Sequence, residues 1–270
     1  MTTKEKTGES AADSLVTVER TMEIIEMLAD ADEGLSVSEI SRRLEVNKNI
    51  AFRILGTLER QNYLFRSEKQ QHYHLTFKVA NLGLRQMTSS GLLDQCQPTI
   101  RALAEKTGEL ARLAIVQHGK PIWIYSASGP RRMLRIDVRW GLEIVLHAHA
   151  TGKAWLSTLS PPELDEVLRD YDLTALTPFT ITDPDALRRE LAATRARGFA
   201  QSWEEMELGV SAIAAPIMVR DVDGTERCVG TLSVAAPMSR ASKEDFARFE
   251  EPLRAAVAAL SSIWPISPDY

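Results

Sequence analysis

Residues 34–77 constrain the fold of this chain more than any other segment, because helix signals and strand signals follow one another there within a short distance. Ser36 and Glu39 have the spacing of a capping box, which marks the start of a helix. Apolar residues then recur at helical spacing for two turns. After a short turn, Asn47 is a suitable N-cap for a second helix that runs to about Gln61. The pattern therefore predicts two helices joined by a tight turn.

A β-hairpin is predicted directly after the second helix. Alternating apolar and polar residues at 63–66 and 72–77 flank a polar tip at 67–71. Helix, turn, helix and hairpin in this order are typical of a winged helix-turn-helix, which places its second helix in the major groove of DNA and its hairpin beside it.

The charge distribution agrees with a surface that meets a polyanion. Residues 36–78 contain eight Lys or Arg and four Glu, a net charge of +4 in a chain whose net charge is −5. The rest of the chain therefore carries about −9. A basic module on an acidic protein favours double-stranded operator DNA as the partner. The alternative is a protein-binding module whose basic face contacts an acidic partner.

Candidate DNA contacts follow from this arrangement. Lys48, Asn49 and Arg53 are expected on the side of the second helix opposite its apolar stripe, where Asn and Arg can each make bidentate contacts to base edges. The hairpin would place further polar and basic side chains along the phosphate backbone or the minor groove. The predicted DNA-binding residues are Ser36, Arg42, Lys48, Asn49, Arg53, Arg66, Lys69 and His72.

Length and composition set the outer limits. A chain of 270 residues corresponds to one large or two ordinary domains, and its apolar share of 44% is normal for a globular protein with a core. No apolar run approaches the ~18 residues that a membrane span needs. Residues 1–13 are polar and look like neither a signal peptide nor an anchor, and two cysteines are too few for a disulfide framework. We therefore expect a cytoplasmic protein without membrane association.

The remaining pattern predicts a second domain. A helix over 16–29 is expected to pack beneath the helix-turn-helix and to contribute to a dimer, and a linker helix is predicted for 79–93, with Gly91 as a break near its end. Another helix is expected to start after Pro98 and to end at Gly108. From there strands and helices alternate, which predicts an α+β domain. Its expected strands lie at 111–117, 121–126, 133–138, 213–220 and 228–235, and its expected helices at 151–160, 162–171, 185–197 and 243–263.

Short motifs in a fixed order along the chain resemble those of IclR-type transcriptional regulators. They lie at residues 18–20, 35–44, 72–75, 146–148, 152–154, 180–183, 197–200, 209–210, 214–216 and 232–234. The resemblance implies an N-terminal winged helix-turn-helix, a linker helix and a C-terminal effector domain of GAF-like topology, in a homodimer or homotetramer controlled by a small organic acid from carbon catabolism. The corresponding bounds are 1–14 for a disordered arm, 15–78 for the DNA-binding domain, 79–95 for the linker helix and 96–270 for the effector domain.

The resemblance also implies a site for a small carboxylate. In similar proteins the site is bounded by the loop that enters the Gly152-Lys153-Ala154 helix, by the acidic stretch before Gly209 and by the last strands. The N-terminus of a helix attracts a carboxylate. Carried over by position, the ligand-binding residues are Ala150, Thr151, Gly152, Ser202, Trp203, Ala212, Ser233 and Ala235. The alternative is that Trp203 belongs to the core and that the small residues only pack.

Departures from the family pattern leave specificity open. Asn47-Lys48-Asn49-Ile50 stands where similar proteins often carry Pro-Lys-Ser-Thr, which puts the base preference in doubt. The acidic stretch begins with Ser202-Trp203 in place of Asp-Asp, and Leu208 stands where Pro is common. The identity of the effector is therefore not carried over. Oxo-acids and aromatic acids both remain open, as do activation and repression.

Other chemical signals are weak. His147 and His149 would lie on one face of an extended segment, with His118 as a third metal ligand, yet no Asp, Glu or Cys has the spacing to complete a site. Gly152-Lys153-Ala154 lacks the first glycine and the Ser/Thr of a phosphate loop. The rival interpretation, a small-molecule enzyme with an accessory helix-turn-helix, needs a convergent acid–base or nucleophile set, and none can be assembled. The sequence thus predicts no enzymatic activity, no cofactor and no metal.

Overall fold

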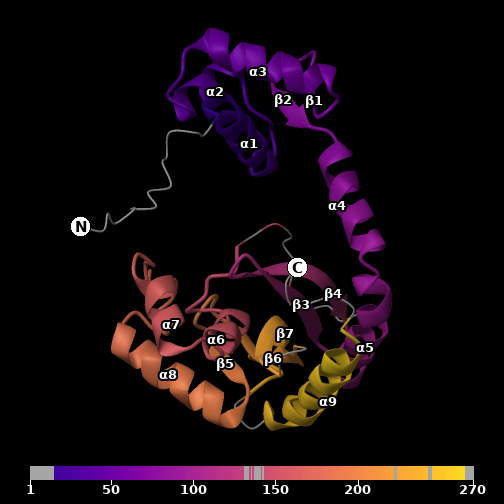
Figure 1. Cartoon of the computed structure of the whole chain (residues 1–270), viewed down its shortest axis with the longest axis vertical. Coiled ribbons are helices and arrows are strands. Elements are labelled where there is room, and N and C mark those ends of the chain that lie inside the picture. Colours follow the sequence, from indigo (N-terminus) through magenta and orange to yellow (C-terminus); the bar gives the residue numbers. More distant parts are fainter. Residues whose placement is uncertain are drawn as a thin grey trace, which may run out of the picture. The chain divides into compact units, whose positions relative to one another are not determined.

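The chain forms two compact units, which are described one by one. The computed structural model describes residues 15–130, 134, 136, 141, 143–221, 224–242 and 245–264. The units divide between Met87 and Thr88 (Figure 1). The arm predicted for 1–14 and most of the strand predicted for 133–138 lie outside the described residues. Across the described ranges, no helix has both the length and the apolar character to span a membrane.

The N-terminal unit has the predicted order of elements. Its elements are α1 (Val16–Ala29), α2 (Val37–Arg43), α3 (Lys48–Arg60), β1 (Leu64–Arg66) and β2 (Tyr73–Leu75). The capping box is present, because the Ser36 hydroxyl accepts from the backbone N–H of Glu39 while the Glu39 carboxylate accepts from the backbone N–H of Ser36 at 2.8 Å. Asn47 caps α3 by accepting from the backbone N–H of Ile50 at 2.9 Å. These local predictions are confirmed.

One core holds this unit together. Ile24 of α1, Ile40 of α2 and Leu55 of α3 are fully buried in it, with Tyr73 of the hairpin. The backbone of Leu35 pairs with Tyr73, so the segment before α2 is joined to the hairpin. The core therefore fixes the hairpin relative to α3, as a winged helix-turn-helix requires.

Helices α4 (Lys78–Ser89) and α5 (Leu92–Thr107) connect the two units and differ from the prediction. Gly91 separates them with a positive φ of 65°, which glycine adopts without steric cost. The helix expected to start after Pro98 begins at Leu92 instead, so Pro98 lies in its interior. Leu92 and Cys96, two turns and one turn before Ile100, are buried on the sheet, and their burial extends the helix toward its N-terminus despite the proline. The proposed bounds of a separate linker at 79–95 stay a prediction.

The C-terminal unit is built on one antiparallel sheet with strand order β4-β3-β7-β6-β5. Its strands are β3 (Leu110–Gln117), β4 (Lys120–Ser128), β5 (Ala200–Trp203), β6 (Val210–Arg220) and β7 (Glu226–Pro237). Its helices after α5 are α6 (Ala150–Leu156), α7 (Pro161–Leu168), α8 (Pro184–Arg197) and α9 (Ala247–Ile263). The short edge strand β5 has no counterpart in the sequence-based assignment. The predicted α+β fold, with an antiparallel sheet and flanking helices, is confirmed.

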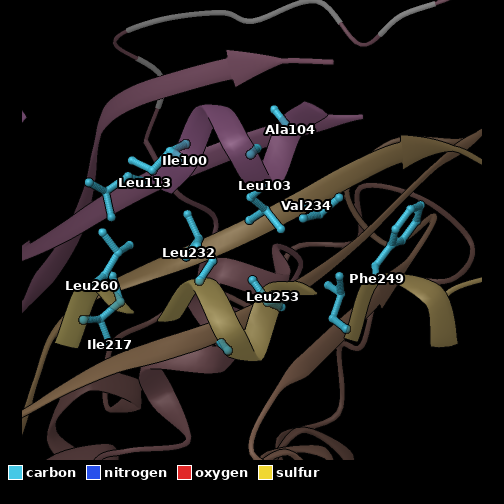
Figure 2. Close-up of a cluster of buried hydrophobic side chains, with 14 of the residues drawn as sticks. Ile100, Leu103, Ala104, Leu113, Ile217, Leu232, Val234, Phe249, Leu253 and Leu260 are labelled. Atoms are coloured by element: carbon cyan, nitrogen blue, oxygen red, sulfur yellow. The ribbon is translucent and has the colours of Figure 1, made fainter. Parts of the chain in front are cut away.

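The two faces of this sheet carry different side chains. Helices α5 and α9 cover one face, called here the α5/α9 face, where large aliphatic residues such as Ile100, Leu232 and Leu253 interlock (Figure 2). Helix α6 packs on the opposite face, called the α6 face, where small residues such as Ala154 and Ala214 meet. The large hydrophobic core therefore lies on one side, and the small, partly polar side chains lie on the other.

Pro98 provides a test of how α5 is stabilised. Its side chain is exposed, and as a proline it cannot donate the helical hydrogen bond to the carbonyl of Asp94. We expect Pro98→Ala to raise the free energy of unfolding by about 1–2 kcal/mol. Alanine restores the missing hydrogen bond, and this gain exceeds the loss that comes from the greater conformational entropy of the unfolded chain without proline. Thermal unfolding followed by circular dichroism measures the change.

Pro161→Ala is the matched control. Pro161 is the first residue of α7, where a proline is well tolerated because its missing N–H has no helical partner. This variant should gain no stability. A melting temperature for Pro98→Ala equal to or below that of the unmodified protein would contradict the explanation.

Candidate DNA-binding surface and ligand site

Helix α3 presents a polar face away from the core of the N-terminal unit. Ala51, Ile54, Leu55 and Leu58 are buried, and Lys48, Asn49 and Arg53 are exposed on the remaining surface. At 100° per residue, Asn49 and Arg53 lie nearly opposite the centre of the buried stripe. The same stripe that holds the helix on the core therefore aims amide and guanidinium donors outward.

An aromatic side chain joins this face, and the sequence analysis did not single it out. Phe52 is 55% exposed and lies between Asn49 and Arg53 in sequence, on the flank of the polar face. Apolar side chains in a major groove contact the methyl group of thymine. The signal was present in the sequence, because Phe52 does not fit the spacing of the buried stripe.

The hairpin carries its three candidates in different settings. Lys69 is exposed at the tip. Arg66 is exposed, and its guanidinium lies 5.6 Å from the centre of the Tyr73 ring. His72 is partly buried, and its Nδ1 donates to the carbonyl oxygen of Glu33 at 2.9 Å. Lys69 and Arg66 are thus accessible cations of the hairpin, whereas His72 also ties the hairpin to the loop before α2.

The two candidates at the ends of α2, the N-cap Ser36 and Arg42, also differ in whether the side chain is free to contact DNA. Arg42 is exposed in the last turn. The Ser36 hydroxyl is occupied within the protein, since it donates to Glu39 Oε2 at 2.6 Å. The hydrogen bonds from Ser36 lower the pKa of the Glu39 carboxyl. A DNA contact by Ser36 would therefore share or replace the capping bond, and it stays a prediction.

The structure brings most of the predicted ligand residues together on the α6 face. Ser202 pairs with Ala212 in the sheet, and Ala212 pairs with Ala235. The Ser202 hydroxyl donates to the carbonyl of Ala148 at 2.7 Å, in the loop that enters α6. Ser233 lies on the same face, two residues along β7 from Ala235.

Trp203 is not part of this group. It follows Ser202 on β5, and successive side chains of a strand point to opposite faces of the sheet. Its indole therefore reaches the α5/α9 face, where its ring centre lies 4.4 Å from that of Phe246. We correct the assignment of Trp203 to the ligand site: it packs in the core, and it cannot cover a ligand on the other face.

The start of α6 is shaped by close packing. Ala150 packs with Ala212 and Ala214, and Thr151 is buried. A Cβ atom on Gly152 would lie 2.4 Å from the Cα and the carbonyl oxygen of Leu146, so only glycine fits there. These contacts explain the small residues at 150 and 152 without a ligand. Their role in binding an acid stays a prediction.

Lys153 and Glu205 form a buried ion pair beside this site. The ammonium donates to both carboxylate oxygens, at 2.6 and 2.8 Å. Burial raises the pKa of Glu205, and the nearby Lys153 charge opposes that rise. The Glu205 carbonyl accepts from the Thr180 hydroxyl at 2.6 Å. The pair joins α6 to the segment after β5, and it commits Lys153 to a partner inside the protein.

The histidines of the entering loop also have internal partners. Nε2 of His147 donates to the carbonyl of Thr174 at 3.0 Å. Nδ1 of His149 accepts from the backbone N–H of Val145 at 3.0 Å. Burial lowers the pKa of His149 to about 4, so its ring is neutral at pH 7. In the part of the chain that the structure describes, no three His, Cys, Asp or Glu side chains gather in a geometry for a metal ion.

Comparison with known proteins agrees with both units. The family described as "IclR helix-turn-helix domain" matches residues 17–67, and the family "Bacterial transcriptional regulator IclR C-terminal" matches residues 85–262. The chain is 34% identical over 225 residues to the HTH-type transcriptional regulator BhcR of Paracoccus denitrificans, covering 83% of this chain and 78% of that protein.

Two solved structures have the same fold. An IclR transcriptional regulator from Alicyclobacillus acidocaldarius has a TM-score of 0.80 and 27% identity, covering 92% of this chain and 98% of that one. An IclR homolog from Microbacterium hydrocarbonoxydans, solved in complex with 4-hydroxybenzoate, has a TM-score of 0.74 and 23% identity, covering 91% and 98%.

Arg53 provides the test of the α3 face. We expect Arg53→Ala to weaken binding to the specific operator by about 1–3 kcal/mol, because a bidentate contact to a base edge is lost, and to change binding to random DNA far less. Fluorescence anisotropy on operator and random duplexes measures both. Arg169→Ala, which removes an exposed arginine from the other unit, is the charge-matched control. Unchanged operator affinity in Arg53→Ala would sink the assignment.

Lys69 should behave differently from Arg53. A phosphate contact carries no sequence information, so Lys69→Ala is expected to weaken binding to operator DNA and to random DNA by similar factors. It should also reduce the steepness with which the logarithm of the DNA association constant falls with the logarithm of salt concentration, by about 1 in the slope. Titrations at several salt concentrations check this. A selective loss at one DNA sequence would contradict a phosphate role.

Proposed function

The chain belongs to the IclR family of transcriptional regulators, and we propose that as a homodimer it binds a pseudo-palindromic operator under the control of a small organic acid. The family makes it a DNA-binding regulator, and the relatives that it matches are named regulators or repressors rather than enzymes. The oligomer, the acid and the residue contacts are the parts we propose. Its target, chromosomal DNA, places such a regulator in the cytoplasm.

One observation carries the DNA-binding part of the proposal. The exposed face of α3 holds Lys48, Asn49 and Arg53 outward while its buried stripe fixes the helix on the core that also holds the hairpin. A helix that reads bases needs both properties, since donors must be accessible and the helix must be rigid.

Exposed apolar side chains support a homodimer. Helix α1 and the residue before it leave several large side chains uncovered, and no residue of α4 is buried within the chain. Burying such a surface against a second copy would remove it from water. A two-fold dimer would then present two α3 helices to two half-sites. A tetramer of two such dimers is the alternative. The exposed residues are Leu15, Val16, Val18, Met22, Leu82 and Leu84.

The effector is proposed to bind on the α6 face of the C-terminal unit. Ser202, Ser233 and small residues of β6 and α6 meet there, in a position that the family resemblance implies for the ligand. The 4-hydroxybenzoate complex of the Microbacterium homolog supports an aromatic carboxylate, and a short oxo-acid is the alternative. The acid would change operator affinity through α4 by a coupling free energy of about 1–3 kcal/mol.

Fluorescence anisotropy on DNA from upstream of the gene itself tests this function. We expect competitor-resistant binding that one acid of a panel changes by about 5–150-fold, the range that such couplings span. The panel contains glyoxylate, pyruvate, benzoate and 4-hydroxybenzoate. Binding without any preference over random DNA, at every salt concentration and with every acid, would contradict the proposal and favour a protein partner for the basic face.

A further inference from the structure

Arg112 is a cation on the α6 face of the sheet that the sequence analysis did not single out. Its neighbours on β3, Ala111 and Leu113, are buried in the core of the α5/α9 face. Alternation along the strand therefore turns Arg112 to the opposite face. It pairs across the sheet with Ser233, one of the predicted ligand residues.

Two of the three guanidinium nitrogens of Arg112 are buried away from any counter-ion. Its Nε and Nη2 atoms are shielded from solvent and have no hydrogen-bond partner among the residues that the structure describes. Its Cζ lies 3.7 Å from the centre of the Trp123 ring, which is an attractive contact but accepts no hydrogen bond from the guanidinium edge. Burial lowers the pKa of Arg112 to about 10, so the group still carries its charge at pH 7.

The shielded cations elsewhere in this unit show what is missing. Arg240 donates to both oxygens of Glu109 at 2.8 and 2.9 Å, and Lys153 binds Glu205. Arg197 donates to Glu190 at 2.6 Å. A guanidinium edge that is shielded from water without such a partner is unfavourable, because the contact with an aromatic face replaces only part of the lost hydration. The charge of Arg112 is therefore best explained by an anion from outside the chain.

The two unsatisfied nitrogens of Arg112 have a defined geometry. Nε–H and Nη2–H lie on one edge of the planar guanidinium and point in parallel. The two oxygens of a carboxylate match that edge and accept both bonds at once, which is the strongest arrangement between these groups. The unpartnered edge is therefore shaped for a carboxylate.

Neighbouring groups provide further polar contacts. Thr231, two residues before Ser233 on the same face of β7, has a buried hydroxyl that finds no hydrogen-bond partner in the described ranges. His149 lies edge-on to Trp123, with 6.4 Å between ring centres. Its Nδ1 lies 3.0 Å from the backbone nitrogen and 3.3 Å from the carbonyl oxygen of Val145, so its own loop holds the ring beside Trp123. Together with Ser233, these residues form what we call the Arg112 cluster.

We propose that Arg112 is the anchor for the effector's carboxylate, and that the effector is a monocarboxylate. This rests on the proposed function and names the chemistry of its ligand. One unpaired positive charge balances one negative charge. The neighbouring basic groups are already accounted for, because Lys153 binds Glu205, His147 donates to the carbonyl of Thr174, and His149 is a neutral ring. A second carboxylate would be buried without a partner, so a dicarboxylate is disfavoured.

The test uses the full-length protein and its Arg112→Met variant. Met removes the charge and keeps a long apolar side chain that can still contact Trp123. Thermal unfolding of each protein is measured without ligand and with one of the monocarboxylates benzoate, 4-hydroxybenzoate, pyruvate or glyoxylate. It is also measured with the dicarboxylates succinate and phthalate, and with benzamide as a neutral isostere of benzoate. Arg169→Met, on the exposed surface of the same unit, is the matched control.

Two results are expected from Arg112→Met. Without ligand its melting temperature should exceed that of the unmodified protein by roughly 2–6 °C, because an unpaired buried charge has been removed. At least one monocarboxylate should raise the melting temperature of the unmodified protein and of Arg169→Met but not of Arg112→Met. Succinate, phthalate and benzamide should raise none of them.

Arg112→Lys provides a second measure. Lysine keeps the charge but lacks the two parallel N–H donors of the guanidinium edge. The concentration of monocarboxylate that gives half of the maximal rise in melting temperature should therefore increase at least tenfold. This variant also keeps the proposal testable if Arg112→Met does not fold.

Three outcomes would overturn the inference. One is an equal response of Arg112→Met and the unmodified protein to a monocarboxylate, and another is a fall in the melting temperature of ligand-free Arg112→Met. The third is no response of the unmodified protein to any acid. Operator binding of the unmodified protein, measured by anisotropy in the same samples, separates the two proposals: intact DNA binding with any of these outcomes removes the Arg112 anchor and leaves the regulator.

Discussion

The alternation of side chains across the five-stranded sheet is the constraint on which the C-terminal unit depends. Strands β3, β6 and β7 send every second residue into the aliphatic core under α5 and α9, which supplies most of the buried apolar surface. Because that face supplies the stability, the other face of the sheet is free to carry Arg112 on β3, Thr231 and Ser233 on β7, and Ser202 on the edge strand β5. A polar site on a rigid sheet follows from this division.

The α6 face carries two cations with different surroundings. Lys153 and Glu205 neutralise each other and hold α6 to the segment after β5. Arg112, on β3 of the same sheet, has the Trp123 ring beside it and no carboxylate partner among the described residues. One buried cation thus serves the structure, and the other is left with an open hydrogen-bonding edge, which is the difference expected between a structural ion pair and a binding group.

Most of the N-terminal unit could be predicted from its sequence, because local interactions decide it. The cap at Ser36, the cap at Asn47 and the apolar stripe of α3 all involve residues within a few positions of one another. The errors arose where distant contacts dominate. Burial of Leu92 and Cys96 carries α5 past Pro98, and sheet pairing turns Trp203 away from Ser202. Neither effect leaves a local signal.

By itself, the sequence determined the order of elements, the polar face of α3 and the family, since capping, periodicity and motif order are encoded in neighbouring residues. Only the tertiary structure decided which face of the sheet each ligand candidate occupies. It also shows that two nitrogens of Arg112 are shielded without a hydrogen-bond partner in the part of the chain that it describes. The physical reason is that the partner of a side chain, or its absence, depends on segments far apart in the chain. From the sequence alone Arg112 resembles an ordinary surface arginine, and only the pairing of β3 with β7 and β4 places it beside Ser233 and Trp123.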